Sequence, residues 1–182
     1  VLGYYKNPKA TEEAFAGGWY HTGDAGHLDD DGHLYYLDRV EYVNRLADGT
    51  KFAPQYIESR LKFSPYIKDA FVVGDETRSY IGAVININYD NVGHWAESKR
   101  ITYTTFADLS QKPEVCRLIG EEVRTLNMKL PGGQRIQRFI NMPKELDPDE
   151  AELTRTMKLR RRLVEDRYKD FIAALYGEKE RV

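Results

Sequence analysis

Short runs of hydrophobic residues, separated by turn-forming residues, predict strands in several parts of the chain. An alternating run at 33–37 follows the stretch 29–32, Asp-Asp-Asp-Gly, and this pattern predicts a β-hairpin near the start of the chain. Three further runs, rich in β-branched or aromatic residues, predict strands over 70–73, 81–87 and 136–142.

Other segments carry hydrophobic residues at helical spacing. Residues 54–63 begin with a proline, which fits the first turn of a helix, and continue with apolar residues four positions apart. The polar and aromatic stretch 88–111 predicts short helices in an insertion, and longer amphipathic helices are predicted over 113–130 and 159–176. Because helices and strands do not alternate strictly, their order predicts an α+β fold with a short mixed or antiparallel sheet and flanking helices.

Composition and charge narrow the classes of function. The chain has 182 residues, enough for one large domain or two unequal pieces, and its 27 basic and 29 acidic residues give a net charge of -2. A chain with this charge balance has no overall positive potential that would attract nucleic acid, so a nucleic-acid-binding function is not indicated. The single cysteine, Cys116, excludes an internal disulfide framework and favours a reducing compartment such as the cytoplasm. No apolar run reaches the ~18 residues of a spanning helix, and the start lacks both a Met and a signal sequence, which together predict an excised fragment.

Three short strings carry candidate chemistry. The string 19–24, Trp-Tyr-His-Thr-Gly-Asp, places a carboxylate at a tight turn, where it suits vicinal hydroxyls such as those of a ribose. An aromatic strand that ends in a turn explains this string equally well. The second string begins with Asp38 and Arg39 and runs to Glu58, and alone its arginine would be an ordinary surface charge. The third, 153–161, puts basic residues at the start of the last predicted helix, where the dipole disfavours cations, so a purpose other than helix stability is expected.

In this order and spacing, the three strings resemble motifs of the adenylate-forming superfamily, which contains acyl-CoA synthetases, luciferases and peptide-synthetase adenylation domains. The first resembles the superfamily's aromatic-x-Thr-Gly-Asp motif. The second resembles its Arg-containing hinge motif with a downstream Gly and Pro-x-x-Ile-Glu, and the third its Thr-x-Ser/Thr-x-Lys-x-x-Arg motif. The likeness covers nearly the whole chain. Asp38, the form of the third string and the insertion around Trp95 are most similar to the long-chain fatty acid CoA ligase branch.

The resemblance implies that the chain is the C-terminal portion of such a ligase and has three parts. Residues 1–38 would be the tail of a large N-terminal adenylate-binding domain, of which the predicted hairpin is a remnant. Residues 39–45 would form a hinge, and residues 46–182 would form a small, mobile C-terminal domain.

The resemblance also assigns roles in ATP binding and catalysis. It implies that Asp24 and Arg39 contact the ribose of ATP or AMP, with Thr22 beside them, and that Lys158 is the catalytic lysine. The superfamily's Thr/Ser-Gly-rich phosphate loop has no counterpart in this sequence. We therefore expect the fragment alone to be inactive.

Two further roles concern movement and the thiol substrate. The pivot of the implied hinge falls on Glu41, where this branch more often has Lys. Arg45 and Gly49 match a loop that enters the site during thioester formation, although Asp48 stands in place of a frequent glycine.

The implied activity is the activation of a long-chain fatty acid with ATP to an acyl-adenylate, followed by transfer of the acyl group to coenzyme A. The implied cofactors and substrates of the full-length enzyme are ATP, Mg2+, coenzyme A and a fatty acid, and the implied partner is the missing N-terminal domain of the same chain. Neither a nucleic-acid partner nor a transmembrane segment is expected, and peripheral association of the parent with membranes is allowed. Two alternatives stay open: a ligase for another carboxylic acid, and a non-catalytic adenylate- or partner-binding module of the same fold.

No metal site is predicted from the histidines or acidic runs. His21, His27 and His33 stand six apart, with no fourth ligand on a shared face. The run 29–32 resembles part of a calcium loop, but a hairpin turn explains it better. The basic run 160–162 is followed by acidic residues, which predicts a solvated mixed-charge helix in preference to a nucleic-acid patch.

Overall fold

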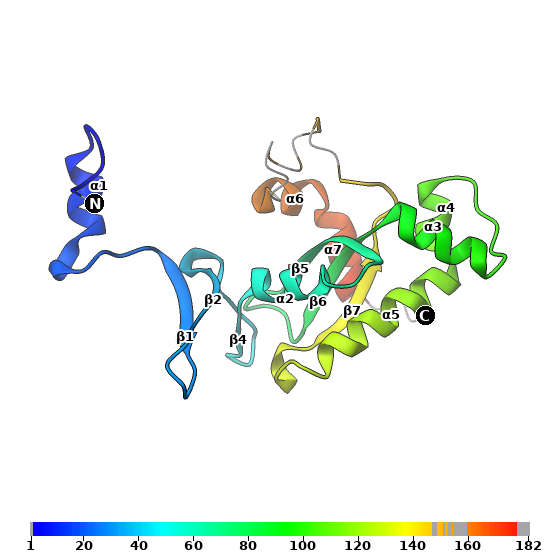
Figure 1. Cartoon of the computed structure of the whole chain (residues 1–182), viewed down its shortest axis with the longest axis horizontal. Coiled ribbons are helices and arrows are strands. Elements are labelled where there is room, and N and C mark those ends of the chain that lie inside the picture. The colour runs from blue at the N-terminus through cyan, green and yellow to red at the C-terminus, as the bar shows by residue number, and fades with distance from the viewer. Residues whose placement is uncertain (1, 147–148, 151, 153, 155–159, 178–182) are drawn as a thin grey trace. The chain divides into compact units, whose positions relative to one another are not determined.

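The computed structural model describes residues 2–146, 149–150, 152, 154 and 160–177, and these fall into two compact units (Figure 1). The first unit is Val1–Val43 and the second is Asn44–Val182. The predicted catalytic residue, Lys158, lies outside the described residues.

The first unit contains a short helix and a hairpin. Helix α1, Pro8–Ala14, begins with a proline and is capped by Asn7, whose Oδ1 accepts a hydrogen bond from the Ala10 N–H at 3.1 Å. A 3₁₀ turn, Ala16–Gly18, follows. The pattern of residues 1–38 predicts only a hairpin, so α1 is an addition to that expectation.

The hairpin predicted at the start of the chain is confirmed. Strands β1, Asp24–Leu28, and β2, Leu34–Arg39, pair antiparallel across a turn in which the Gly32 N–H donates to the Asp29 carbonyl at 3.0 Å. The register shifts by one residue between Ala25 and Gly26, which is a β-bulge.

The second unit is built on a three-stranded mixed sheet, which confirms the predicted α+β class. Its strands are β5, Ile67–Val73, β6, Ile81–Ile87, and β7, Ile136–Asn141. Their order is β5-β6-β7, with β5 antiparallel and β7 parallel to the central strand β6. A separate pair of short strands, β3, Asn44–Arg45, and β4, Lys51–Phe52, precedes the sheet.

Helices pack on both faces of this sheet. They are α2, Pro54–Leu61, α3, Tyr89–Ser98, α4, Phe106–Gln111, α5, Pro113–Asn127, α6, Arg161–Arg167, and α7, Lys169–Tyr176, with a 3₁₀ turn at Gly132–Gln134. The helices expected over 54–63, 88–111 and 113–130 are confirmed. The single helix expected over 159–176 is wrong: it divides at Tyr168, which leaves helical geometry with φ -104° and ψ 18°.

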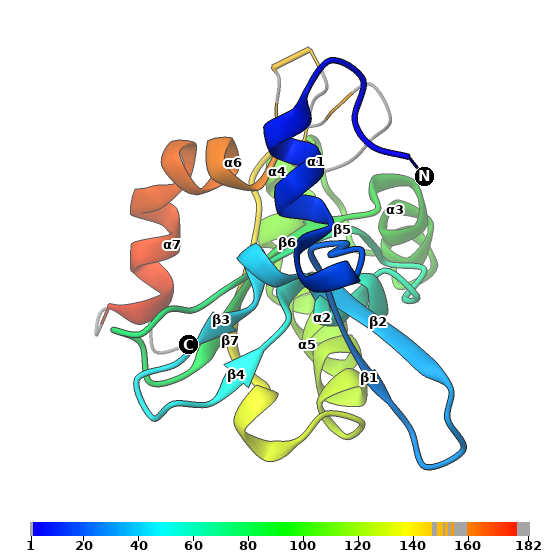
Figure 2. The same cartoon turned by 90° about the vertical axis from the view of Figure 1, so that its left-hand side faces the viewer.

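Alternation along the central strand β6 creates two hydrophobic cores. Ile81, Ala83, Ile85 and Ile87 point into the larger core, with α2, α3, α4 and α5. Val84, on the opposite face, joins the smaller core with Val164 of α6 and Leu175 of α7. Figure 2 shows the sheet with α6 and α7 on one side and α2 and α5 on the other. No helix in the described part of the chain combines the length and hydrophobicity that crossing a membrane requires.

Candidate functional site

Three of the predicted ATP-binding residues meet at the open end of the first unit's hairpin. Asp24 on β1 and Arg39 on β2 are cross-strand partners, and their side chains form an ion pair with 2.9 Å between Arg39 Nη1 and Asp24 Oδ1. The same Nη1 donates to the Thr22 carbonyl at 2.6 Å. The predicted residues Thr22, Asp24 and Arg39 are therefore in direct contact.

The turn that leads into β1 depends on a glycine. Gly23 has φ +74°, a left-handed conformation that L residues adopt only with strain. Its carbonyl accepts a hydrogen bond from the Val40 N–H at 2.9 Å, and the Thr22 hydroxyl oxygen accepts one from the Asp24 N–H at 3.1 Å. These hydrogen bonds fix the backbone at Asp24 and therefore the position of its carboxylate.

The Asp24–Arg39 pair remains accessible. The Asp24 side chain is 39% exposed and that of Arg39 is 51% exposed, so the pair contributes little to stability. Burial raises the pKa of the nearby Tyr36, and the carboxylates of Asp38 and Asp24 raise it further. A carboxylate held in this way can accept hydrogen bonds from two adjacent hydroxyls, and the guanidinium beside it can donate to an oxygen of the same ligand.

Glu41, the predicted pivot, lies in a single 3₁₀ turn, Val40–Tyr42, and its side chain is exposed. The turn closes with a hydrogen bond from the Val43 N–H to the Val40 carbonyl at 3.3 Å. The division between the two compact units comes one residue after this turn, between Val43 and Asn44.

The predicted thiol-side loop is the connection between β3 and β4. Arg45 is exposed and pairs with Lys51, and Gly49 has φ +86°. The Thr50 N–H donates to Asp48 Oδ1 at 2.8 Å, and this bond lowers the pKa of the Asp48 carboxyl. The aspartate that departs from the superfamily's pattern therefore stabilises the turn.

The third string is joined to the second through a buried ion pair that the sequence did not reveal. Arg161 Nη2 lies 2.5 Å from Glu58 Oε1, and the two side chains are only 13% and 11% exposed. Arg161 Nη1 also donates to the Val72 carbonyl at 3.2 Å, while Glu58 Oε1 accepts from the Val72 N–H at 2.8 Å. The expectation of a solvated helix at 160–162 is therefore wrong for Arg161, whose charge tolerates burial because Glu58 neutralises it. Both residues stand in the quoted strings, but no spacing rule connects them.

One cluster of ligand-type side chains lies in the hairpin turn. Single ligand atoms of Asp29, Asp31 and His33 lie within 4.8 Å of one another. Asp29 Oδ1 already accepts hydrogen bonds from the backbone N–H groups of Asp31 and His33, at 3.0 and 2.8 Å. The bond from His33 is the main cause of the lowered pKa of Asp29. These contacts are those of a hairpin turn whose aspartate caps its own backbone.

Comparison with protein families decides the affiliation of the second unit. Residues 43–180 match the family model described as "AMP-binding enzyme C-terminal domain". The chain belongs to this family. The match begins one residue before the second compact unit and extends past α7.

Among curated proteins, relatives of this family member are fatty-acid CoA ligases by name. The chain is 33% identical over 178 residues to long-chain-fatty-acid–CoA ligase FadD15 of Mycobacterium tuberculosis, covering 97% of this chain and 30% of that protein. It is 30% identical over 179 residues to fatty acyl-CoA synthetase B of Dictyostelium discoideum, covering 97% of this chain and 26% of that protein. The chain thus spans less than a third of the length of these relatives.

Among solved structures, the similarity extends to adenylation domains of carboxylic acid reductases. The domain from Mycobacterium chelonae is 29% identical, with a TM-score of 0.72 and coverage of 96% of this chain and 26% of that chain. The domain from Segniliparus rugosus, solved with AMP and a co-purified carboxylic acid, is 25% identical, with a TM-score of 0.72 and coverage of 97% and 26%.

Proposed function

We propose that this chain is the C-terminal part of an AMP-forming acyl-CoA synthetase that activates a long-chain fatty acid with ATP and transfers the acyl group to coenzyme A. The observation that carries the proposal is the accessible Asp24–Arg39 pair, held against Thr22, in a chain of the AMP-binding enzyme C-terminal family. The names of the relatives in Mycobacterium and Dictyostelium support the choice of acid and thiol.

The first unit would hold the nucleoside. Asp24, with 39% of its side chain exposed, would accept hydrogen bonds from the two ribose hydroxyls, and Arg39 would donate to a ribose oxygen. Because their ion pair is already formed across the hairpin, neither side chain needs to be ordered when ATP binds. Their role is positioning.

Lys158 would supply the charge for the first half-reaction. The fatty acid carboxylate attacks the α-phosphorus of ATP, pyrophosphate leaves, and negative charge accumulates on the oxygens around that phosphorus. A fixed ammonium stabilises this charge more in the transition state than in the ground state. Mg2+ would enter with the phosphates of ATP and neutralise part of their charge; we assign no residue of this chain to it.

The second half-reaction would require a different surface of the second unit. The thiol of coenzyme A loses its proton and attacks the carbonyl carbon of the acyl-adenylate, and AMP leaves. We assign the rotation to the segment 39–45 with its pivot at Glu41, which is supported by the division into compact units directly after Val43. Rotation would withdraw Lys158 and bring in the loop with Arg45 and Gly49.

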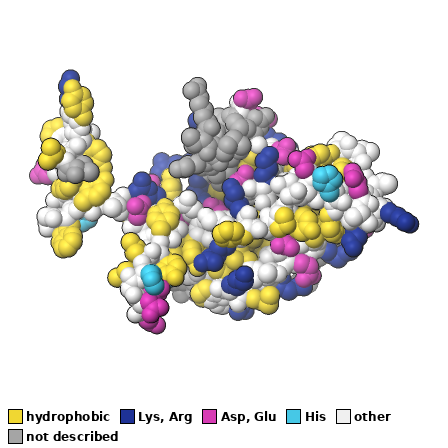
Figure 3. All heavy atoms as spheres, viewed as in Figure 1, with side chains coloured by type: hydrophobic (Ala, Val, Ile, Leu, Met, Phe, Trp, Pro, Cys, Tyr) yellow, Lys and Arg dark blue, Asp and Glu magenta, His cyan; other side chains and the backbone are white. Residues whose placement is uncertain are grey.

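The exposed hydrophobic side chains of the first unit support a larger parent protein. Figure 3 shows hydrophobic side chains on the surface of the helical segment and the hairpin. The large ones are Leu2, Tyr4, Tyr5, Trp19, Tyr20, Leu28, Leu34, Tyr35, Tyr36 and Val40. A unit that exposes so many of them requires a covering surface, and we assign that surface to an N-terminal domain of the same parent, which would carry the phosphate loop and acyl pocket.

Two candidate functions differ in the acid that is activated. The resemblance to adenylation domains of carboxylic acid reductases favours, as a second candidate, a ligase that activates another carboxylic acid. Both candidates require Asp24, Arg39 and Lys158. They differ only in the pocket that binds the acid.

The proposal is tested with the full-length parent protein, supplied with ATP, Mg2+, coenzyme A and a series of acids from acetate to palmitate and benzoate. We expect AMP, pyrophosphate and acyl-CoA to form, fastest with long-chain acids. A preference for short or aromatic acids would select the second candidate. Failure of every acid to promote exchange of labelled pyrophosphate into ATP would contradict both and leave a non-catalytic module.

A further inference from the structure

The thiol-side loop between β3 and β4 lies against the turn that joins β5 to β6. The Ala47 N–H in the loop donates to the Arg78 carbonyl in the turn at 2.9 Å, and Asn44 Nδ2 donates to the Gly74 carbonyl at 3.2 Å. A Cβ on Gly74 would lie only 3.0 Å from Cζ of the buried Phe52, so the turn is in close contact with the base of the loop. The position of the loop therefore depends on that of the turn.

The tip of the loop is not held by packing. Residues 47–49 are exposed. Hydrogen bonds from the Gly49 N–H to the Leu46 carbonyl and from the Leu46 N–H to the Thr50 carbonyl, both 2.9 Å long, fix the shape of the loop. They do not fix its direction relative to the sheet, because they join residues of the loop to one another. The bond from Ala47 to Arg78 reaches another element and supplies that constraint.

Arg78 is held through both its backbone and its side chain. Its N–H donates to the Asp75 carbonyl at 2.9 Å, and its Nε lies 3.9 Å from Asp75 Oδ2. Its guanidinium carbon lies 4.2 Å from the centre of the Tyr176 ring, which is a cation–π contact. The arginine thus connects the turn to the last residue of α7.

Tyr176 is fixed against the sheet. Its hydroxyl donates to the Val73 carbonyl of β5 at 2.9 Å, and its ring centre lies 5.0 Å from that of Tyr80. The Tyr80 hydroxyl and Arg138 Nη1 both donate to the Leu175 carbonyl, at 2.8 and 3.3 Å. Burial raises the pKa of Tyr176 to about 12, so its hydroxyl stays protonated and continues to donate at neutral pH.

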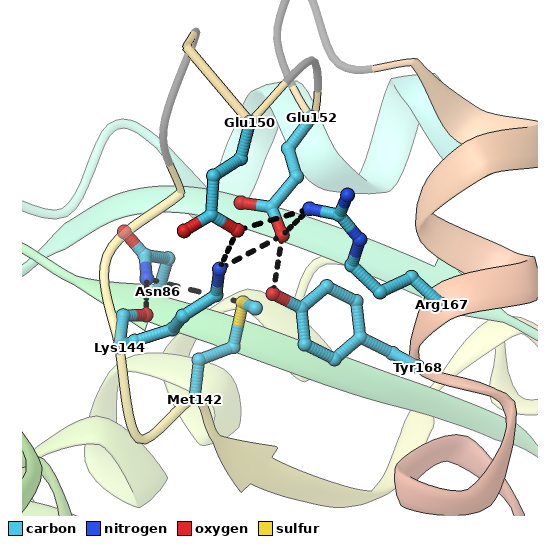
Figure 4. A network of polar contacts seen from close by, with 7 residues as sticks. All are labelled: Asn86, Met142, Lys144, Glu150, Glu152, Arg167 and Tyr168. Atoms are coloured by element: carbon cyan, nitrogen blue, oxygen red, sulfur yellow. Dashed lines mark hydrogen bonds and ion pairs between the residues drawn. The ribbon is translucent and has the colours of Figure 1, made fainter.

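The start of α7 is fixed by a buried carboxylate. Glu152 has no exposed surface, and three donors converge on its Oε1 (Figure 4). They are the Tyr168 hydroxyl at 2.5 Å, Arg167 Nη1 at 2.9 Å and Lys144 Nζ at 3.2 Å. Tyr168 directly precedes α7, and the Lys144 carbonyl accepts a hydrogen bond from Asn86 Nδ2 of β6 at 2.8 Å. This network and the contacts of Tyr176 anchor both ends of α7 to the sheet, so α7 is a firm support for Arg78.

We propose that Arg78 is a positioning residue for the thiol-side loop: its carbonyl holds Ala47, and its side chain ties the turn to Tyr176. This inference rests on the proposed function, in which the loop enters the site for thioester formation, and it adds a residue outside the quoted strings. Arg78 acts through the loop and is assigned no contact with a substrate. Its placement affects the rate because a 1 Å displacement of a group that positions the reactants costs about 100-fold.

The first arm of the test removes the hydrogen bond to Arg78. Ala47 is the second residue of the turn closed by the Gly49 N–H, a position that proline favours, so Ala47→Pro deletes the donor with little strain. In the full-length parent, we expect thioester formation from a supplied acyl-adenylate and coenzyme A to slow about 100-fold, with pyrophosphate exchange unchanged. The matched control, Asp30→Pro, occupies the same position in the hairpin turn 29–32 and should retain both half-reactions.

The second arm changes the side chain of Arg78. Arg78→Ala removes the contact with Tyr176 and keeps the backbone carbonyl, so it should give a smaller loss of thioester formation with adenylation unchanged. Arg78→Lys can place its ammonium over the same ring and should restore most of the rate. The matched control is Arg60→Ala, which removes an equally close contact with the Tyr56 ring on α2 and should affect neither half-reaction.

The outcomes separate failure of this inference from failure of the proposed function. A wild-type parent that forms no acyl-CoA would overturn both. If the wild type completes both half-reactions, a wild-type rate of thioester formation in Arg78→Ala overturns only the inference. An equal loss in both half-reactions, no recovery in Arg78→Lys, or the same loss in Arg60→Ala would also overturn it. If Ala47→Pro does not fold, the variants of Arg78 and Arg60 decide the outcome.

Discussion

Glu58 and Arg161 stand 103 residues apart in the sequence, and their charged atoms lie 2.5 Å apart in the structure. Glu58 belongs to α2 and Arg161 begins α6, so the pair ties a helix of the larger core to a helix of the smaller core. Both also bond to the backbone of Val72 on the edge strand β5. One ion pair thereby connects elements on opposite faces of the sheet.

Breaking this pair from one side should destabilise the chain. We expect Glu58→Ala to lower the free energy of unfolding by about 3 to 5 kcal/mol, because it leaves Arg161 charged and nearly buried and removes the acceptor for the Val72 N–H. Glu58→Gln, which keeps an acceptor oxygen, should cost less. Urea unfolding followed by circular dichroism measures both, and equal stability of wild type and Glu58→Ala would contradict the contact.

Replacing Lys158 should affect one half-reaction. In the parent protein, Lys158→Ala should slow adenylate formation by about 100 to 1000-fold, or about 3 to 4 kcal/mol, because a preorganised charge is removed from the transition state. The reaction of a supplied acyl-adenylate with coenzyme A should proceed normally. Pyrophosphate exchange reports the first step and single-turnover thioester formation the second; an equal fall in both would point to misfolding.

Fixing the pivot should give the opposite pattern. Proline at position 41 restricts φ to about -65° and removes an N–H, so Glu41→Pro should hinder the dihedral change that rotation of the second unit requires. We expect adenylation to persist and thioester formation to be lost. Glu41→Ala, which removes the exposed side chain and leaves the backbone free, is the matched control and should retain both. Normal thioester formation by the proline variant would remove Glu41 from the hinge.

The loop between β3 and β4 should be sensitive to its glycine. Gly49 has φ +86° with open space around a hypothetical Cβ, so the cost of Gly49→Ala is conformational, about 1 to 2 kcal/mol. Gly132 has equally open surroundings without a left-handed φ, and Gly132→Ala should be neutral or stabilise by up to about 1 kcal/mol. Thermal unfolding compares the two variants. Equal effects would show that the left-handed conformation is absent.

Alkaline pH should weaken the network around Glu152. The pKa of Tyr168 is about 12 in the folded chain against an ordinary value of 10.0, so its protonated form favours folding. That contribution is complete below pH 10 and is lost as pH rises toward 12. The free energy of unfolding of Tyr168→Phe should therefore fall less between pH 10 and pH 12 than that of the wild type. In the absorbance titration, this variant should lack one tyrosine that ionises near pH 12. An unchanged titration would contradict the partly buried position of Tyr168.

The elements that sequence predicts correctly are those with strong local patterns. The runs 70–73 and 81–87 become β5 and β6 because their β-branched residues fill both faces of a covered sheet. The turn 29–32 forms because Asp29 and Gly32 meet the local demands of a hairpin. By contrast, α1 has seven residues and no buried side chain, so it leaves no hydrophobic stripe to detect.

The site was only partly accessible from the sequence. Asp24 and Arg39 were predicted as ribose-binding residues from their similarity to known motifs, and their spacing in the sequence did not contribute. Their ion pair forms because the register of β1 and β2 places them opposite each other. The contacts of Glu152 and Arg161 join segments that are separated in the sequence, and no local periodicity predicts them. The break at Tyr168 is likewise tertiary, since its hydroxyl is held by Glu152 while its neighbours continue a helical pattern.

The bulge in the first unit's hairpin determines which charge Asp24 meets. From the turn, Leu28 pairs with Leu34 and Gly26 with Tyr36, and the same register continued to position 24 would place Asp24 opposite Asp38. Two carboxylates facing each other across a ladder repel. The extra residue in β2 shifts the pairing so that Asp24 faces Arg39. Leaving Leu37 outside the ladder thus replaces a repulsive pair with an attractive one, and a regular register in which Leu37 paired with Ala25 would abolish the ion pair while every residue of that pair remained in the sequence.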